Sequence, residues 1–240
     1  MSSTSSYNAK STVCFIDRQE AGERLAEAVW AEMHRRSLIG QVPPLVYALP
    51  RGGISVAAPV AQRLKCPLGV IVAKKITRPE NVELAIGAVT ATGDVVWSPY
   101  LEGQSRWTTA DSSSLPPMYA TALQAAKHRA QAQWATFATC CPPMNAAGTI
   151  ALLIDDGIAT GMTMAAAVRS LRAQHPTEIW ICVPVAPPEV IPALQTWADQ
   201  VIILALPPLF GSVSRFYRQF PQVEMEAAIE QLQMVNSVIG

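Results

Sequence analysis

The sequence has little charge of either sign. Only 15% of its 240 residues are charged, and 18 Lys and Arg residues balance 18 Asp and Glu residues. Such a surface has no net field that attracts nucleic acid over its whole extent, so we expect no nucleic-acid partner. Half of the residues are apolar. This supply is enough for a large core and fits a homodimer that hides part of its surface.

Long apolar runs and a cysteine framework are also missing. No run reaches the roughly 20 residues of a membrane span, and the Ser- and Thr-rich N-terminus does not resemble a signal peptide. The five cysteines are odd in number and show no metal-ligand spacing, which argues against a disulfide scaffold. We therefore expect a cytoplasmic protein with reduced thiols and no membrane partner. Residues 1–12 are expected to be a disordered tail before a single domain over 13–240.

Short apolar runs and amphipathic segments alternate along the chain. The runs predict five buried strands of a parallel sheet, and the amphipathic segments predict helices between them. Between the second and third strands, the turn sequence Ala91-Thr92-Gly93-Asp94 predicts a β-hairpin. The alternation favours an open, doubly wound, mainly parallel five-stranded α/β sheet, whose ligands bind beyond the carboxyl ends of the strands. The predicted strands are 45–49, 68–73, 150–154, 179–183 and 201–205, the hairpin arms are 84–90 and 95–97, and the helices are about 18–36, 56–64, 118–137, 162–173 and 189–197.

Two carboxylates and a Gly/Thr loop follow the third predicted strand. Asp155 and Asp156 can accept hydrogen bonds from vicinal hydroxyls or hold the water shell of Mg²⁺. The next residues run into a helix N-terminus, where backbone N–H groups and the helix dipole suit a phosphate. Together they predict a ribose 5-phosphate site, although an acidic strand end with a simple helix cap stays an alternative. The candidate phosphate-binding residues are Gly157, Ile158, Ala159, Thr160, Gly161, Met162 and Thr163.

This loop differs from the common nucleotide-binding motifs. The Gly-x-Gly-x-x-Gly string of dinucleotide-binding folds is absent, and so is the Gly-Lys-Ser/Thr of a Walker loop. The site is therefore expected to hold a phosphorylated ribose and not a dinucleotide or a nucleoside triphosphate.

Cationic side chains follow the first two predicted strands. Arg51, with Gly52 and Gly53 beside it, can contact a phosphate through its guanidinium while the glycines let the backbone turn N–H groups toward the anion. Lys74 can reach a further anionic oxygen as a point charge. The alternatives are a tight turn with a surface Arg and, at Lys74-Lys75, two solvated lysines.

These strings resemble the type I phosphoribosyltransferases, and most closely a bacterial group of predicted members. The similarity extends from about Phe15 to Phe220. It rests on the following stretches: Phe15-Ile16-Asp17-Arg18, Ala48-Leu49-Pro50-Arg51-Gly52-Gly53, Glu83-Leu84-Ala85-Ile86-Gly87-Ala88-Val89, Asp155 to Thr163, and Val183-Pro184-Val185-Ala186.

The resemblance implies a reaction. It implies Mg²⁺-dependent transfer of phosphoribosyl from 5-phosphoribosyl-1-pyrophosphate (PRPP) to a nitrogenous base, with release of pyrophosphate. Arg51 and Lys74 would be the pyrophosphate contacts, and Asp155 and Asp156 the ribose and metal contacts. The hairpin over 76–97 would be a mobile lid, and residues 13–43 and 206–240 would form a small hood.

The acceptor side is less defined by sequence. The resemblance implies that Pro184 and Val185 help to close the substrate side. Phe210 and Tyr217 follow the fifth strand and can stack on a planar base, or form a core cluster instead. Two other functions stay open: a non-catalytic regulator that senses PRPP or nucleotides, and a hydrolase acting on a related phosphoribosyl substrate.

Overall fold

The computed structural model describes residues 14–78, 80–98 and 117–239. The predicted tail over 1–12 and most of the loop before the long helix therefore lie outside the described residues. The helices are α1 (Arg18–Arg35), α2 (Gly52–Leu64), α3 (Pro117–Phe137), α4 (Met162–Arg172), α5 (Ile191–Trp197) and α6 (Met225–Ile239), with 3₁₀ turns η3 (Pro188–Val190) and η4 (Val213–Phe216). The strands are β1 (Pro44–Ala48), β2 (Leu68–Val70), β3 (Ala73–Arg78), β4 (Asn81–Thr90), β5 (Val95–Trp97), β6 (Ile150–Ile154), β7 (Glu178–Val185) and β8 (Gln200–Ala205).

The main sheet is parallel and five-stranded, in the order β2-β1-β6-β7-β8. The predicted open, doubly wound α/β fold is thereby confirmed. The chain runs from β1 outward to β2 and later returns on the other side of β1 to form β6. The strand order therefore reverses between β1 and β6, which is where such sheets open a crevice for ligands.

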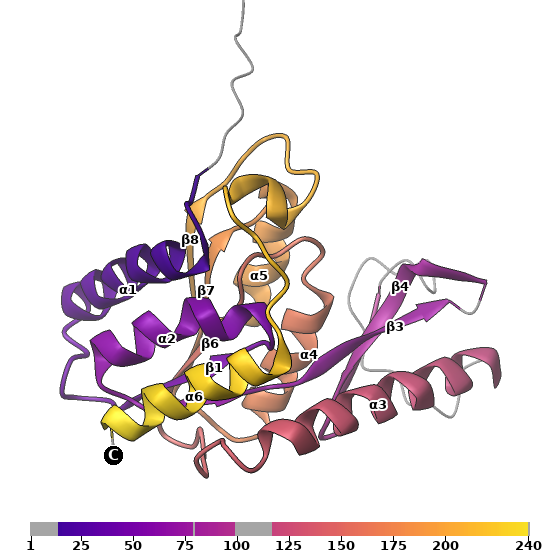
Figure 1. The fold of residues 1–240 in the computed structure, drawn as a ribbon, viewed down its shortest axis with the longest axis horizontal. Helices are drawn as coiled ribbons and strands as arrows, with labels where there is room; N and C mark the ends of the chain where they lie inside the picture. The colour runs from indigo at the N-terminus through magenta and orange to yellow at the C-terminus, as the bar shows by residue number, and fades with distance from the viewer. Residues whose placement is uncertain (1–13, 79, 99–116, 240) are drawn as a thin grey trace, which may run out of the picture.

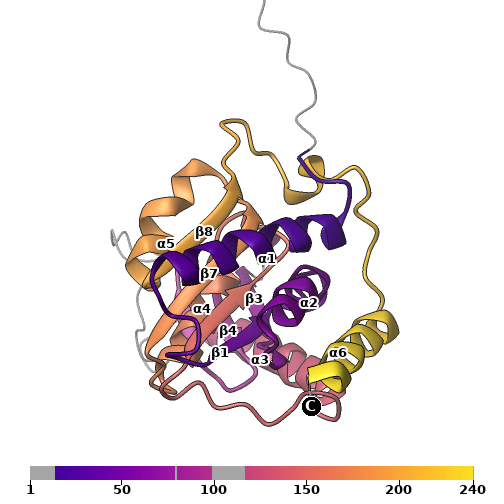
Figure 2. The same ribbon diagram turned by 90° about the vertical axis from the view of Figure 1, so that its left-hand side faces the viewer.

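Helices cover both faces of this sheet. Side chains alternate along β1, so that Val46 and Ala48 join the apolar cluster of α1, α2 and α6, whereas Tyr47 and Leu49 join the cluster of α4 and α5. Figure 2 shows α1, α2 and α6 along one side of the sheet. None of the described helices is long and apolar enough to cross a membrane.

The segment after β1 differs from the prediction in two places. The helix α2 begins at Gly52, four residues before the predicted start, and continues through Pro59. Gly22 of α1 lies so close to α2 that a Cβ there would be 2.6 Å from the Val56 carbonyl oxygen and 3.0 Å from Pro59 Cγ. Pro59 therefore lies within α2 at the place where the two helices pack most closely.

The predicted strand over 68–73 is also wrong in extent, because the chain leaves the main sheet after Val70. Ala73 begins β3, which pairs antiparallel with β4, and β4 pairs antiparallel with β5. The predicted hairpin is thus part of a three-stranded sheet. Figure 1 shows this second sheet projecting from the main one, with α3 beside it. The sheet packs on α3 through Ile76 and Trp97 and on α4 through Ala88.

The N-terminal end of the described chain pairs with the segment that follows β8. The backbone N–H groups of Cys14 and Phe15 both donate to the Phe216 carbonyl at 2.9 Å, and Arg218 N–H donates back to the Phe15 carbonyl at 2.9 Å. We use the name hood segment for residues 206–224, which this pairing holds near the carboxyl ends of the strands.

Candidate active site

The loops after β1 and β6 are in direct contact. Ala48 and Ile154 are partners in the parallel ladder, and Leu49 N–H donates to the Ile154 carbonyl at 2.9 Å. A Cβ on Gly52 would lie only 2.0 Å from Asp156 Oδ2, and one on Gly53 would lie 3.0 Å from the Ile154 carbonyl oxygen. Both glycines are therefore needed so that the Arg51 loop can approach the two carboxylates.

The Asp155–Asp156 pair lies at the centre of the crevice. Asp155 Oδ1 accepts a hydrogen bond from Asp156 N–H at 2.8 Å, and Asp156 Oδ2 accepts one from Arg18 Nε at 2.8 Å. Burial raises the pKa of Asp155 well above its usual range, and the neighbouring Asp156 charge raises it further. Burial also raises the pKa of Asp156, although Arg18 opposes that shift. Hydrogen-bond donors or a cation placed here would stabilise the ionised pair.

Arg18 is a site residue that sequence reasoning missed. Its Nη1 donates to the Pro221 carbonyl at 2.7 Å, and its Cζ lies 3.6 Å from the centre of the Phe220 ring. These contacts fix the guanidinium between the hood segment and Asp156. A sequence signal existed, because a cation in the first turn of a helix opposes the helix dipole and calls for a separate partner.

The loop after Asp156, predicted to be a phosphate cradle, lies at the start of α4. It lines a cavity of about 210 Å³ together with Asp155 and Lys75. Gly161 has φ +75° and precedes α4, whose first turn has no side-chain cap. The Met162 side chain packs against the antiparallel sheet instead, so only its backbone belongs to the cradle. Uncapped N–H groups at a helix N-terminus are suited to a phosphate.

A second cavity, of about 480 Å³, is lined by Arg18 and Gly52, which both lie next to Asp156. Arg18, Arg51 and Lys74 line it, with Gln133 from α3 and residues of the hood segment. Burial lowers the pKa of Lys74, and the charges of Arg51 and Arg129 lower it further. Three cations at one cavity favour an anion with several charged oxygens. No pattern in the sequence pointed to Gln133. It lies on α3, which a loop separates from β6, and no neighbouring residue suggests that its side chain lies at the crevice.

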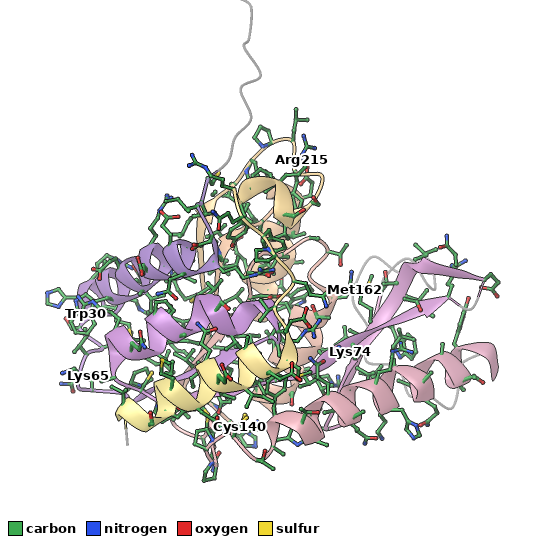
Figure 3. All side chains as sticks on the ribbon, in the orientation of Figure 1. Trp30, Lys65, Lys74, Cys140, Met162 and Arg215 are labelled. Atoms are coloured by element: carbon green, nitrogen blue, oxygen red, sulfur yellow. The ribbon has the colours of Figure 1, made fainter. Side chains whose placement is uncertain are left out.

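Lys74 and Lys75 line different cavities. Lys74 belongs to the larger, cationic cavity and Lys75 to the phosphate cradle. Neighbouring residues of a strand point to opposite sides, and both lysines lie near the start of β3. Figure 3 labels Lys74 and Met162 near the junction of the two sheets. The two lysines therefore face different cavities, and Lys75 is the more exposed of the two.

Comparison with known proteins identifies the fold family. Residues 16–216 match the model of the phosphoribosyl transferase domain family. The chain belongs to this family. The type I phosphoribosyltransferase resemblance expected from the sequence is thereby confirmed.

Individual relatives agree with this assignment. The crystal structure of TT1426 from Thermus thermophilus is similar with a TM-score of 0.73 and 32% identity, covering 92% of this chain and 98% of that one. Two proteins of Mycobacterium tuberculosis, from strains CDC 1551 / Oshkosh and ATCC 25618 / H37Rv, are named provisionally as phosphoribosyl transferases. Each is 33% identical over 215 residues, which is 90% of this chain. The chain spans 45% of the length of these two relatives.

The four residues predicted for the acceptor side lie at the end of β7 and in the hood segment. Pro184 and Val185 are buried at the end of β7, where Val185 packs beside Gly157. Phe210 is half-buried, with its ring centre 5.2 Å from that of Phe216. Tyr217 is 5% exposed, and its hydroxyl donates to the Asp156 carbonyl at 2.6 Å. Phe210 is thus the more accessible of the two aromatic candidates.

The two carboxylates fit the Mg²⁺ that the family implies. Asp155 Oδ2 and Asp156 Oδ1 are not used in the contacts described above, and oxygen ligands with several retained waters suit this ion. Among the described residues, no cluster of three or more His, Cys, Asp or Glu side chains forms a metal cage. Asp155 and Asp156 would therefore hold Mg²⁺ with the help of water and substrate oxygens.

Proposed function

We propose that this phosphoribosyltransferase binds PRPP and Mg²⁺ across the crevice and transfers phosphoribosyl to a nitrogenous base of the nucleobase class. The observation that supports this most is that the carboxylate pair adjoins two cavities: Asp155 lines one of them, and Asp156 pairs with Arg18, which lines the other. The first is the predicted cradle for a single phosphate, and the second is the cavity lined by Arg18, Arg51 and Lys74. PRPP carries its phosphate, diol and pyrophosphate in this order.

Each part of the substrate then has its own contacts. The 5-phosphate would accept hydrogen bonds from backbone N–H groups of residues 157–163 and an ionic contact from Lys75. The ribose hydroxyls would donate to Asp155 and Asp156, and these bonds would favour the ionised carboxylates. Mg²⁺, when bound, would neutralise part of the pyrophosphate charge. Arg51 and Lys74 would stabilise the charge that grows on pyrophosphate as it leaves.

No side chain needs to act as a nucleophile in this scheme. The bond between the ribosyl carbon and pyrophosphate breaks, a nitrogen of the base forms the new bond, and the proton of that nitrogen passes to the released pyrophosphate or to water. The protein contributes positions and charges, and these can account for a large part of such a rate enhancement. Phe210 would contact the base, Pro184 and Val185 would form the floor beneath it, and Tyr217 would hold the Asp156 backbone.

The lid predicted over 76–97 is proposed here in a narrower form. The register between β3 and β4 shifts at Ile76/Thr77 and again at Thr77/Arg78. Residues nearer the main sheet, such as Ile76 and Val89, are fully buried, whereas Leu84 is 46% exposed. Closure would therefore bend the distal part of β3 and β4 at these bulges while the buried part stays fixed. Closure would keep water from the ribosyl carbon.

The two lysines provide a test of the division of the crevice. Lys74→Ala is expected to weaken binding of inorganic pyrophosphate about 10- to 100-fold, since a charged contact contributes about 1.5–3 kcal/mol, and to leave ribose 5-phosphate binding nearly unchanged. Lys75→Ala is expected to weaken binding of ribose 5-phosphate and to leave pyrophosphate binding nearly unchanged. Its effect should be smaller because Lys75 is exposed. Calorimetric titration with each ligand measures both.

Lys65→Ala is the matched control for these variants. Lys65 is an exposed lysine at the end of α2, far from Lys74 (Figure 3). Its replacement should change neither the affinity for pyrophosphate nor the affinity for ribose 5-phosphate. Equal losses for both ligands in Lys74→Ala and in Lys75→Ala would contradict the proposed division.

Turnover is tested by release of pyrophosphate from PRPP and Mg²⁺ with single nucleobases added. We expect at least one base to raise the rate above that of PRPP alone, and Lys74→Ala to lower that rate. If PRPP binds but no base promotes release, the sensor function is favoured. If PRPP is cleaved equally well without a base, the hydrolase function is favoured. A homodimer and a cytoplasmic location stay predictions from composition.

A further inference from the structure

A separate cavity of about 630 Å³ lies beside β1 and β2, between α3, α4 and the turn that joins β4 to β5. None of the residues that line the phosphate cradle or the cationic cavity lines this one. The helix α4 connects the two places. Met162 begins this helix at the 157–163 loop, and Ser170, which lines the cavity, lies about 12 Å further along the helix axis.

Neighbouring residues of β1 and β2 form one wall of the cavity. Tyr47 of β1 and Gly69 of β2 are partners in the parallel ladder, and both line the cavity. The loop before β6 covers this wall in part, with Met144 directly over Gly69. A Cβ on Gly69 would be 2.4 Å from Met144 Sδ.

The lining of this cavity is uncharged. None of the described residues that line it is Asp, Glu, Lys, Arg or His. Aromatic walls come from Tyr47 and from Trp134, which is 37% exposed, and the thioether of Met144 adds a soft apolar contact. An anion would find no cation here, which separates this cavity from both parts of the crevice.

Polar groups are present at a few points of the wall. Thr92 Oγ1 and Ser170 Oγ lie 3.2 Å apart, and Asp94 Oδ2 accepts from Thr92 Oγ1 behind them at 2.7 Å. The Tyr47 side chain is 5% exposed, and among the described residues its hydroxyl has no hydrogen-bond partner. Burial raises the pKa of Tyr47 to about 12, so this hydroxyl keeps its proton at neutral pH. A buried hydroxyl without a partner is unusual and favours an acceptor supplied from elsewhere.

We propose that this cavity is a second ligand site, for an uncharged, planar aromatic molecule with one polar edge. Its volume lies within the roughly 300–1,000 Å³ typical of small-molecule sites, and an apolar wall with a few polar groups is their usual composition. The flat part of the ligand would lie between Tyr47 and Trp134. Its polar edge would meet the hydroxyls of Tyr47, Thr92 or Ser170.

The experiment uses 2-naphthol as an uncharged probe and naphthalene-2-carboxylate as a charged counterpart of similar shape. Saturation-transfer NMR on the intact chain is expected to detect 2-naphthol and to give at least tenfold weaker binding of the carboxylate. Ala138→Trp, at an exposed position lining the cavity, should abolish binding by filling it. Ala132→Trp, at an exposed position of α3 that does not line the cavity, should leave binding unchanged.

Tyr47→Phe tests the hydroxyl without changing the ring. We expect the affinity for 2-naphthol to fall several-fold. The melting temperature of the ligand-free protein should stay the same or rise, because removing this hydroxyl breaks no hydrogen bond within the described residues. Three results would overturn the proposal: no binding of 2-naphthol up to its solubility limit, equal binding of the carboxylate, or full binding to a folded Ala138→Trp variant.

Discussion

Replacing both Asp155 and Asp156 with Asn is expected to remove PRPP binding while the protein stays folded. Asn keeps the shape of Asp but removes the charged oxygens that would accept from the ribose hydroxyls. Hydrogen bonds to charged groups contribute about 1.5–3 kcal/mol each, so two of them correspond to a loss of roughly 100-fold or more. Calorimetry with PRPP and Mg²⁺ measures the loss, and circular dichroism checks the fold.

The single substitution Asp155→Asn is expected to stabilise the free protein. Burial raises the pKa of both carboxyl groups, so their ionised forms are disfavoured in the folded state. A raised folded-state pKa means that stability is lost as the pH rises through that pKa. Asp155→Asn alone should therefore make the free protein more stable at neutral pH, which a higher melting temperature would show.

Asp199→Asn is the matched control for the double variant. Asp199 lies just before β8, at the end of the sheet opposite the crevice, and pairs with Arg172 at 2.8 Å. Its replacement should leave PRPP affinity unchanged. If the folded double variant at Asp155 and Asp156 binds PRPP as well as the unaltered protein does, the ribose assignment is wrong.

Gly161→Val is expected to abolish binding of every ligand that carries a 5-phosphate. Gly161 has φ +75°, a conformation that a β-branched residue strongly disfavours, and a Cβ there would lie 3.2 Å from Trp197 Cζ3. The loop would have to shift, and the N–H groups at the start of α4 would no longer converge on the phosphate. Titration with ribose 5-phosphate should show at least a 100-fold loss, or roughly 3 kcal/mol.

Gly148→Val is the control that separates the effect of backbone strain from the loss of the phosphate site. Gly148 has φ +71°, close to the value at Gly161, but a Cβ there would meet no other atom within 4 Å. Both variants therefore carry similar backbone strain, and both should lose some stability. Only Gly161→Val should lose phosphate binding. Equal retention of ribose 5-phosphate in the two variants would place the phosphate elsewhere.

The fold could be predicted because its signals are local. Strands β1, β6, β7 and β8 are short apolar runs between covering helices, and those helices carry periodic apolar residues. The break after Val70 could not be predicted, because Ile71 and Val72 are buried as well and continue the apolar run. Which sheet a strand joins depends on its partner, and the partner of β3 is β4.

The site was predictable where one short string carries it. The Asp155–Thr163 segment and the Arg51 loop each combine their chemistry within a few residues, and the parallel ladder brings the two together. Arg18 and Gln133 come from helices outside those strings. Arg18 bonds directly to Asp156, 138 residues away in the sequence, and also to Pro221 of the hood segment, and no local pattern specifies either partner.

The most direct test of the account is calorimetric titration of the intact chain with PRPP in the presence of Mg²⁺. The account predicts one saturable site per chain, with competition by ribose 5-phosphate and, separately, by pyrophosphate, because each fills one of the two cavities that adjoin the Asp155–Asp156 pair. Absence of saturable binding, or binding that neither ligand displaces, would contradict it.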